Sequence, residues 1–183
     1  MTAGIFGGSF NPVHNGHIIL AKALVGNGLV DEVWLTLSPL NPLKANPSEL
    51  VSDIMRLDML HLAAHGVPGL RVCDIELSLP RPSYTINTLR ALSAAYPSTD
   101  FRLVIGSDNM LIFDRWKCHE EIMRDYPPIV YPRPGYPCPG TIDLPQYDIS
   151  STIIRERLRK GESVDGMLPP QVINYISRHG LYR

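Results

Sequence analysis

Apolar residues recur along this chain with two periods, one typical of strands and one typical of helices. Alternating or short continuous apolar runs predict strands at residues 2–7, 31–38, 70–77, 101–105 and 128–131. Apolar residues three and four positions apart predict helices at residues 15–26, 49–65, 84–96, 107–113, 117–125, 151–160 and 170–179. Ser83 is the expected cap of the third helix, and Pro97 and Gly180 are typical stop signals.

This alternation predicts an α/β fold, a Rossmann-like doubly wound parallel sheet with helices on both faces, because short links between strands and helices favour right-handed crossovers. The 183 residues suit a single domain (1–183), whose last part, about 150–183, is a small helical portion. The continuous apolar run at 101–105 is typical of a central strand. In such sheets ligands bind beyond the carboxyl ends of the strands. We therefore expect the loop after residue 7 and the segment 106–108 to face one crevice.

Composition narrows the functional class. The formal net charge of −1 offers no basic excess for a nucleic-acid partner, and the longest apolar runs are too short to cross a bilayer. The first strand begins at residue 2, which leaves no room for a signal peptide. The three cysteines are widely spaced, as is usual for free thiols in a reducing compartment, so we expect a cytoplasmic protein. Six prolines between residues 127 and 139 predict a rigid surface loop or edge around the last strand.

The segment from residue 4 to residue 17, GIFGGSFNPVHNGH, predicts a phosphate site. Gly7 and Gly8 lack a Cβ, so the backbone can turn tightly and let an anion approach its N–H groups. The helix start that follows adds unpaired N–H donors and the positive end of the dipole. His14 and His17 are placed to donate further hydrogen bonds, with a positive charge when protonated. The glycine spacing matches neither a P-loop nor a dinucleotide-binding loop.

A second motif, ISSTIIRERL at residues 149–158, allows two interpretations. It could be an ordinary surface helix, capped by Ser150 or Ser151, with a solvated Arg155. It could also be a second phosphate-binding helix start, at which the hydroxyl groups of Ser151 and Thr152 and the Arg155 guanidinium converge on polyphosphate oxygens. The motif by itself does not decide between the two.

Both motifs resemble those of the nucleotidyltransferase superfamily, which carries a GxFxPxHxGH signature near the start and an ISSTxxR signature near the end. Ser9 and Asn11 stand where bacterial members often have Thr and Asp, and both keep the polar, turn-forming character. Two such motifs in one chain favour the phosphate-binding interpretation of both.

The middle of the chain resembles one branch of that superfamily, the bacterial nicotinate-nucleotide adenylyltransferases. The similarity rests on Pro-Ser-Tyr-Thr at 82–85, Gly-Ser-Asp at 106–108, Trp116 and the segment 168–182. It implies transfer of the adenylyl group of ATP to nicotinate mononucleotide, with pyrophosphate as the second product, in NAD biosynthesis. Mg²⁺ bound through the ATP oxygens is the implied cofactor, since no cluster of carboxylates for a dedicated metal site is evident.

The resemblance also implies site residues. The implied catalytic residues, which stabilise charge on the phosphates, are His17, His14 and Arg155. The implied ATP-binding residues are Gly7, Gly8, Ser9, Phe10, His14, His17, Gly106, Asp108, Ser151, Thr152 and Arg155. The implied nicotinate-mononucleotide-binding residues are Ser9, Lys44, Tyr84, Thr85 and Trp116.

The residue types suit these roles. Trp116 offers a π face to the cationic pyridinium ring, and Thr85 near a helix start offers donors to the ring carboxylate. Asp108 could accept hydrogen bonds from a ribose or help to hold a metal ion, and ordinary packing or capping is the alternative for each of these residues. Lys44 occupies a basic position of a family loop in which Leu43 replaces the usual His.

Two metal-site interpretations can be rejected, and two functional alternatives remain. His61 and His65 are four residues apart on a helix without a glutamate between them, so they do not form a metalloprotease motif, and His14 and His17 lack further zinc ligands. Another nucleotidyltransferase, specific for nicotinamide mononucleotide, phosphopantetheine or a cytidylyl donor, shares the first motif. A nucleotide sensor without activity would keep the fold but should have lost His17 or Arg155, which are both present. The sequence does not reveal the oligomeric state.

Overall fold

A parallel sheet forms the centre of the molecule. The computed structural model describes residues 1–39, 50–144 and 149–183. Within these residues the sheet has five strands in the order β3-β2-β1-β4-β5, and each neighbouring pair is parallel. The strands are β1 (Thr2–Gly8), β2 (Glu32–Leu37), β3 (Leu70–Cys73), β4 (Asp100–Gly106) and β5 (Ile129–Tyr131). The predicted parallel α/β fold is confirmed.

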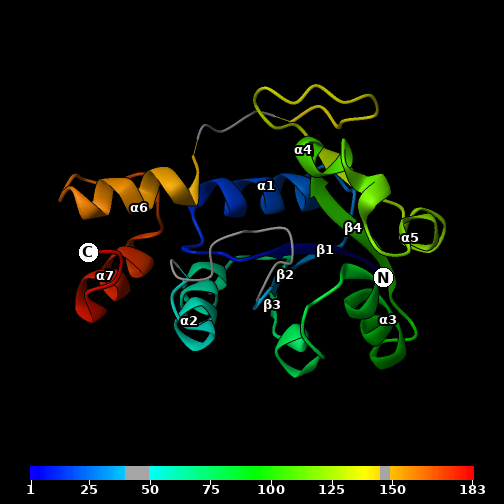
Figure 1. Ribbon diagram of the computed structural model, residues 1–183, viewed down its shortest axis with the longest axis horizontal. Coiled ribbons are helices and arrows are strands. Elements are labelled where there is room, and N and C mark those ends of the chain that lie inside the picture. Colours follow the sequence, from blue (N-terminus) through cyan, green and yellow to red (C-terminus); the bar gives the residue numbers. More distant parts are fainter. Residues whose placement is uncertain (40–49, 145–148) are drawn as a thin grey trace.

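Helices connect the strands and extend the chain beyond the last one. The α-helices are α1 (Asn15–Gly26), α2 (Asp53–Ala64), α3 (Thr85–Ala95), α4 (Ser107–Met110), α5 (His119–Asp125), α6 (Ser151–Arg159) and α7 (Pro170–His179). Two short 3-10 helices, η2 (Ile75–Ser78) and η3 (Phe113–Arg115), lie between them. The helices α6 and α7 lie at the end of the molecule away from α3 and α5 (Figure 1).

The two faces of the sheet are covered by different helices. Alternate side chains of β2 show this directly, since Val33 and Leu35 share a buried cluster with α1 and α2. Trp34 points the other way, into a second cluster with α3 and α5. In the strand order, the chain runs from β1 outward to β3 on one side and from β4 outward to β5 on the other. The order thus reverses between β1 and β4, and the carboxyl ends of these two strands lie at the crevice where ligands bind in such folds.

The third strand is shorter than the predicted span of 70–77. It pairs with β2 over four residues, from Leu70 to Cys73, and the chain then turns into η2. The apolar residues Ile75 and Leu77 continue the strand pattern, but the Asp74 carbonyl accepts a hydrogen bond from the Leu77 N–H and closes a helical turn. This turn places Glu76 inside the protein, at 6% exposure.

Two predicted helix starts are wrong in detail. The helix predicted at 49–65 begins at Asp53, because the Ser52 hydroxyl accepts a hydrogen bond from the Met55 N–H at 3.4 Å and caps it there. Residue 49 lies outside the described residues. Ser83 does not cap α3, which begins at Thr85 with Tyr84 at the cap position and no side-chain cap. The expected short helix at 107–113 is α4 followed by η3, and the remaining predicted elements agree to within two residues.

Arg56 of α2 connects the segments that surround the mouth of the crevice. Its side chain is fully buried, and it donates hydrogen bonds to the carbonyl oxygens of Ser9, Ser38 (2.9 Å) and Val51 (3.0 Å). It also forms an ion pair with Asp53, which pairs on its other side with Arg81 at 2.8 Å. Burial lowers the pKa of Arg56, with Asp53 opposing that effect. The turn after β1 is thus joined to α2.

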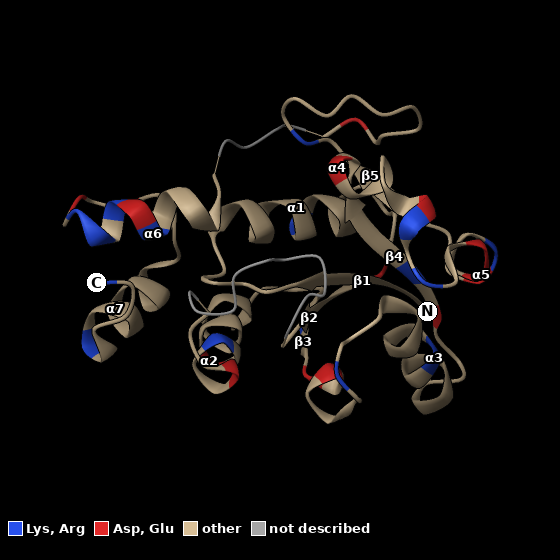
Figure 2. Cartoon of the chain, viewed as in Figure 1, with Lys and Arg blue, Asp and Glu red and all other residues tan. Residues whose placement is uncertain are grey.

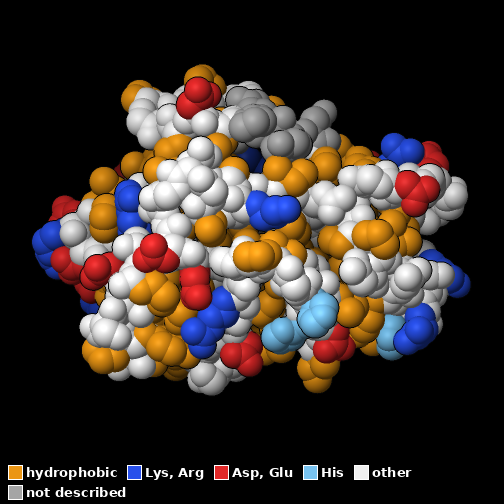
Figure 3. Space-filling model, turned by 180° about the vertical axis from the view of Figure 1, so that it is seen from behind, with side chains coloured by type: hydrophobic (Ala, Val, Ile, Leu, Met, Phe, Trp, Pro, Cys, Tyr) orange, Lys and Arg blue, Asp and Glu red, His pale blue; other side chains and the backbone are white. Residues whose placement is uncertain are grey.

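Charged side chains lie mainly outside this framework. Figure 2 shows β1 without acidic or basic residues and α6 with both kinds side by side. Acidic and basic side chains are also interspersed on the opposite face of the molecule (Figure 3). Among the helices of the described residues, none combines the length and the apolar character that a membrane span requires.

We expect Arg56→Met to destabilise the protein strongly. The substitution leaves several inward-facing carbonyl groups without their donor and takes from Asp53 one of its two cations, and removal of one partner of a buried ion pair costs about 3–5 kcal/mol. For a chain of this size, that corresponds to a decrease of roughly 10 °C in the melting temperature. Urea and thermal unfolding of the purified variant measure the effect.

Arg81→Met is the matched control. It removes the other cation of Asp53, but the Arg81 side chain is 53% exposed, so the loss should be about 1 kcal/mol or less. Equal destabilisation by the two substitutions would contradict the structural importance assigned to Arg56.

Candidate functional site

The turn after β1 leaves no room for a side chain at Gly8. A Cβ at Gly8 would lie 3.1 Å from the ring of Phe10, whereas a Cβ at Gly7 would have no atom within 4 Å. Phe10 has a left-handed backbone (φ 44°), which is unfavourable for a residue with a side chain. Its ring is buried and packs edge-on against Phe6, with centroids 6.0 Å apart, and this packing stabilises the turn.

His14 and His17 lie at the start of α1, with their rings stacked 3.6 Å apart. The His14 backbone N–H donates a hydrogen bond to Nδ1 of His17 at 3.1 Å. In the neutral His17 side chain the proton must therefore be on Nε2, so that this atom is a hydrogen-bond donor. The edges of Phe6 and Phe10 pack against the same ring and hold its orientation, with centroids at 5.7 and 5.0 Å.

His14 is electrostatically different from His17. It is 5% exposed, and burial, with a smaller contribution from the nearby Arg133 charge, lowers the pKa of His14 to about 3. At neutral pH His14 is therefore uncharged and can donate one hydrogen bond. Two stacked imidazolium rings would repel each other, and the low pKa of His14 avoids that arrangement.

The second motif, at the start of α6, contacts the turn of the first. The Ser150 hydroxyl accepts a hydrogen bond from the Ile153 N–H at 3.2 Å and caps α6. The next hydroxyl, that of Ser151, donates to the Pro12 carbonyl at 2.9 Å, and Nη1 of Arg155 donates to the Asn11 carbonyl at 3.0 Å. The interpretation of this segment as an ordinary capped surface helix does not account for these contacts, since they join residues more than a hundred positions apart.

A cleft of about 200 Å³ opens beyond the carboxyl ends of the strands. Of the predicted ligand-binding residues, the cleft is lined by Gly7, Gly8, Tyr84, Thr85, Gly106 and Trp116. The loop after β1 and the segment after β4 thus face one crevice, as expected. Trp116 packs against Phe113, with centroids 5.4 Å apart, and its indole Nε1 is buried without a hydrogen-bond partner among the described residues.

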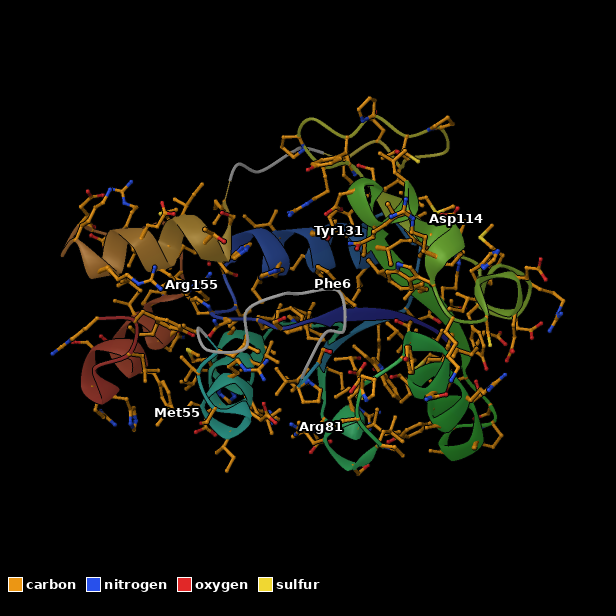
Figure 4. The ribbon with its side chains drawn as sticks, in the orientation of Figure 1. Phe6, Met55, Arg81, Asp114, Tyr131 and Arg155 are labelled. Atoms are coloured by element: carbon orange, nitrogen blue, oxygen red, sulfur yellow. The ribbon has the colours of Figure 1, made fainter. Side chains whose placement is uncertain are left out.

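A smaller recess of about 50 Å³ adjoins this cleft and is lined by His14, His17 and Arg133. Phe6 and Tyr131 line both cavities and pack edge to face, with centroids 5.7 Å apart (Figure 4). Burial raises the pKa of Tyr131 to about 12, so its hydroxyl keeps its proton at neutral pH. Figure 4 also shows Arg155, which comes from α6 on the other side of the turn.

Asp108 lies next to both cavities, although it lines neither. Its Oδ1 atom is buried without a hydrogen-bond partner among the described residues, and Nε of Arg133 is 3.8 Å away. A Cβ at position 106 would lie 2.3 Å from this oxygen, which explains the glycine there. In the part of the chain that the structure describes, no three His, Cys, Asp or Glu side chains are arranged to hold a metal ion.

Several predicted residues lie away from the cavities. Thr152 is exposed, and Ser9 and Phe10 are buried within the turn. Ser151 and Arg155 contact the turn from α6, and none of these five residues lines either cavity. Lys44 lies outside the described residues, so the structure says nothing of its predicted contact with the mononucleotide.

The cleft also contains residues that sequence reasoning missed. The carboxyl group of Glu76 accepts a hydrogen bond from the Thr88 hydroxyl at 2.9 Å, and burial raises the pKa of Glu76. Lys117 lines the cleft beside Trp116, and Arg133 faces the smaller recess. Their signals in the sequence were weak, because a charged residue outside a motif is usually solvated.

Comparison with known proteins identifies related sequences. Residues 5–157 match the family model described as cytidylyltransferase-like. A protein of Bacteroides fragilis named "Probable nicotinate-nucleotide adenylyltransferase" is 46% identical over 94% of this chain and 90% of its own. A relative of the same name from Porphyromonas gingivalis is 43% identical over 92% of this chain and 90% of its own.

A similar fold is known from a solved structure. The nicotinic acid mononucleotide adenylyltransferase of Plasmodium falciparum, complexed with NaAD, superposes with a TM-score of 0.81 at 20% identity, covering 99% of this chain and 97% of the other. At this identity the likeness concerns the fold. Together with the sequence matches, it shows that the chain belongs to the cytidylyltransferase-like family, among the nicotinate-nucleotide adenylyltransferases.

Proposed function

We propose that this protein transfers the adenylyl group of ATP to nicotinate mononucleotide, forming nicotinate adenine dinucleotide and pyrophosphate. The observation that carries the proposal is the meeting of two phosphate-type motifs at the turn after β1, whose glycines Gly7 and Gly8 line a cleft that extends to Trp116 and Thr85. The relatives named for this activity, up to 46% identical over nearly the whole chain, support it.

In this reaction an oxygen of the mononucleotide phosphate attacks the α-phosphorus of ATP, and the bond from that phosphorus to the bridging oxygen of pyrophosphate breaks. The attacking phosphate has a second pKa of about 6, so it is mostly deprotonated at neutral pH and needs no general base. The protein's contribution is then to align the two phosphates and to neutralise charge that develops between them.

The side chains around the turn suit that task. Nε2–H of His17 is a fixed donor, because Nδ1 is already occupied by the backbone. The Arg155 guanidinium and the N-terminus of α6 provide positive charge and N–H donors beside the turn, where the β and γ phosphates would lie. His14 adds a neutral donor, so the two stacked rings can both face the phosphates.

Mg²⁺ would reach this site together with ATP. Magnesium commonly binds through substrate phosphates and a few carboxylates, and the buried Oδ1 of Asp108 is a suitable oxygen for such a contact or for a ribose hydroxyl. When bound, the ion would neutralise charge on the phosphate oxygens.

The three cysteines are free thiols, which suits a reducing compartment such as the cytoplasm.

A pyrophosphate-release assay tests the proposed reaction. The purified protein is given ATP or CTP with nicotinate mononucleotide, nicotinamide mononucleotide or phosphopantetheine. We expect the highest kcat/KM for ATP with nicotinate mononucleotide. Preference for CTP or for phosphopantetheine would assign the chain to another transferase, and release in no combination would favour a nucleotide sensor.

We expect His17→Ala to reduce kcat by about 10²–10³, the effect of removing one donor from a developing anionic centre, about 2.7–4 kcal/mol. The affinity for ATP should change much less, because the other donors remain. Steady-state kinetics and ATP titration separate the two effects. His61→Ala, on the exposed side of α2, is the control and should keep the wild-type rate. An unchanged kcat in His17→Ala would remove this side chain from the chemistry.

Trp116→Ala should raise the KM for the mononucleotide at least tenfold and leave the KM for ATP nearly unchanged. The indole face lies in the part of the cleft away from the phosphate-type motifs, and a cation above it is stabilised by roughly 0.5–2 kcal/mol in addition to the lost packing. Trp116→Phe keeps an aromatic face and should lose less. A change in the KM for ATP alone would mean that the Trp116 indole contacts ATP and not the mononucleotide.

A further inference from the structure

Lys117 contributes a positive charge to the part of the cleft that lies beside α3. It lines the cleft next to Trp116, and its Nζ atom lies over the ring of Tyr84, 4.6 Å from the centroid. A cation at this distance from an aromatic face is attracted to it. The contact therefore holds the ammonium group of an otherwise exposed side chain near the start of α3.

The first turn of α3 offers hydrogen-bond donors at the same place. An α-helix leaves its first N–H groups without intrahelical partners, and the cap residue of α3, Tyr84, provides no side-chain cap. The neighbouring Ser83 hydroxyl is 8% exposed, lines the cleft and interacts with the Glu76 carboxyl group.

Two arginines of the neighbouring helices are already paired, whereas Arg115, which also lines the cleft, is not paired with any residue that the structure describes. Arg90 of α3 pairs with Glu121, and Arg124 pairs with Asp125, both on α5. Lys117 forms no ion pair with any residue that the structure describes. Its charge is thus available to an anion in the cleft.

The carboxyl group of Glu76 also lines this cleft, and it forms no ion pair with Lys117. Burial raises the pKa of Glu76, because the low-polarity surroundings favour its neutral form. Its Oε1 atom is also held by the Thr88 hydroxyl, one turn inside α3.

The ends of the substrate can be matched to the ends of the cleft. A mononucleotide that places its phosphate near the turn after β1 and the start of α6 must direct its ring toward Trp116 and α3. Nicotinate carries a carboxylate on that ring, whereas nicotinamide carries a neutral amide. The two substrates therefore differ in one substituent, which is an anionic acceptor in the acid and a neutral group with two N–H donors in the amide.

We propose that Lys117 is a specificity-determining residue, whose ammonium group binds the ring carboxylate and makes the enzyme prefer the acid over the amide mononucleotide. This inference rests on the proposed function and adds to it the side chain that discriminates between the two substrates. Charge-assisted hydrogen bonds are about twice as strong as neutral ones, so the acid should lose more than the amide when the charge is removed.

The test compares kcat/KM for the acid and the amide mononucleotide in four variants. Lys117→Met should lower the acid-to-amide ratio at least tenfold, mainly through a higher KM for the acid, with the KM for ATP unchanged. Lys117→Arg keeps the charge and should stay within about threefold of the wild-type ratio. Lys22→Met, on the exposed side of α1, removes the same charge far from the cleft and should leave the ratio unchanged. Arg115→Met removes the other cation that lines the cleft.

Binding of each mononucleotide, measured by calorimetry without ATP, provides a readout that does not depend on turnover. An acid-to-amide ratio that is unchanged in Lys117→Met, or one that decreases in Arg115→Met instead, would overturn the role of Lys117 and leave the proposed function intact. Wild-type protein that binds neither mononucleotide would overturn both. A lower binding preference in Lys117→Met would support the inference even if turnover were slow.

Discussion

The carbonyl groups of the turn after β1 are bound by side chains from two distant helices, and the rest of the site depends on these bonds. Arg56 of α2 holds the Ser9 carbonyl, while Arg155 and Ser151 of α6 hold those of Asn11 and Pro12. Polar backbone groups buried without partners are costly, so the turn keeps its shape only when both helices are in place. The same bonds place the N-terminus of α6 beside that of α1, so that the positive ends of two helix dipoles lie next to the same turn.

Electrostatic tuning of the site follows from burial. His14 is neutral because its surroundings disfavour a charge, and the backbone contact at Nδ1 makes His17 a donor through Nε2. Because one of the two stacked imidazole rings is neutral and helix ends supply N–H groups, this end of the site carries few full charges, and its burial costs less. Arg155 and Arg133 add the positive charge at its edges.

The cleft has two chemically different ends. Polar donors lie near the turn and α6, whereas aromatic rings and Lys117 lie near α3 and η3. Between the small recess and the large cleft lie the rings of Phe6 and Tyr131, which line both. A ligand with an anionic phosphate at one end and an aromatic ring at the other fits this polarity. The sheet positions both ends, because the strand order reverses between β1 and β4.

Local physics was sufficient to predict the order of strands and helices, the parallel sheet and the two motifs, since hydrophobic period, glycine turns and helix caps are properties of neighbouring residues. The sequence-based predictions were wrong where tertiary contacts determine the structure. The apolar pattern of 70–77 does not reveal that only four of these residues pair with β2. Ser83 was predicted to cap α3, but Tyr84 occupies the cap position. The positions of Glu76, Arg133 and Lys117 in the two cavities follow from how α3, η2 and the proline-rich segment pack on the sheet. A single charged or polar side chain is equally suited to solvent and to a site, and only the folded arrangement of its neighbours distinguishes the two.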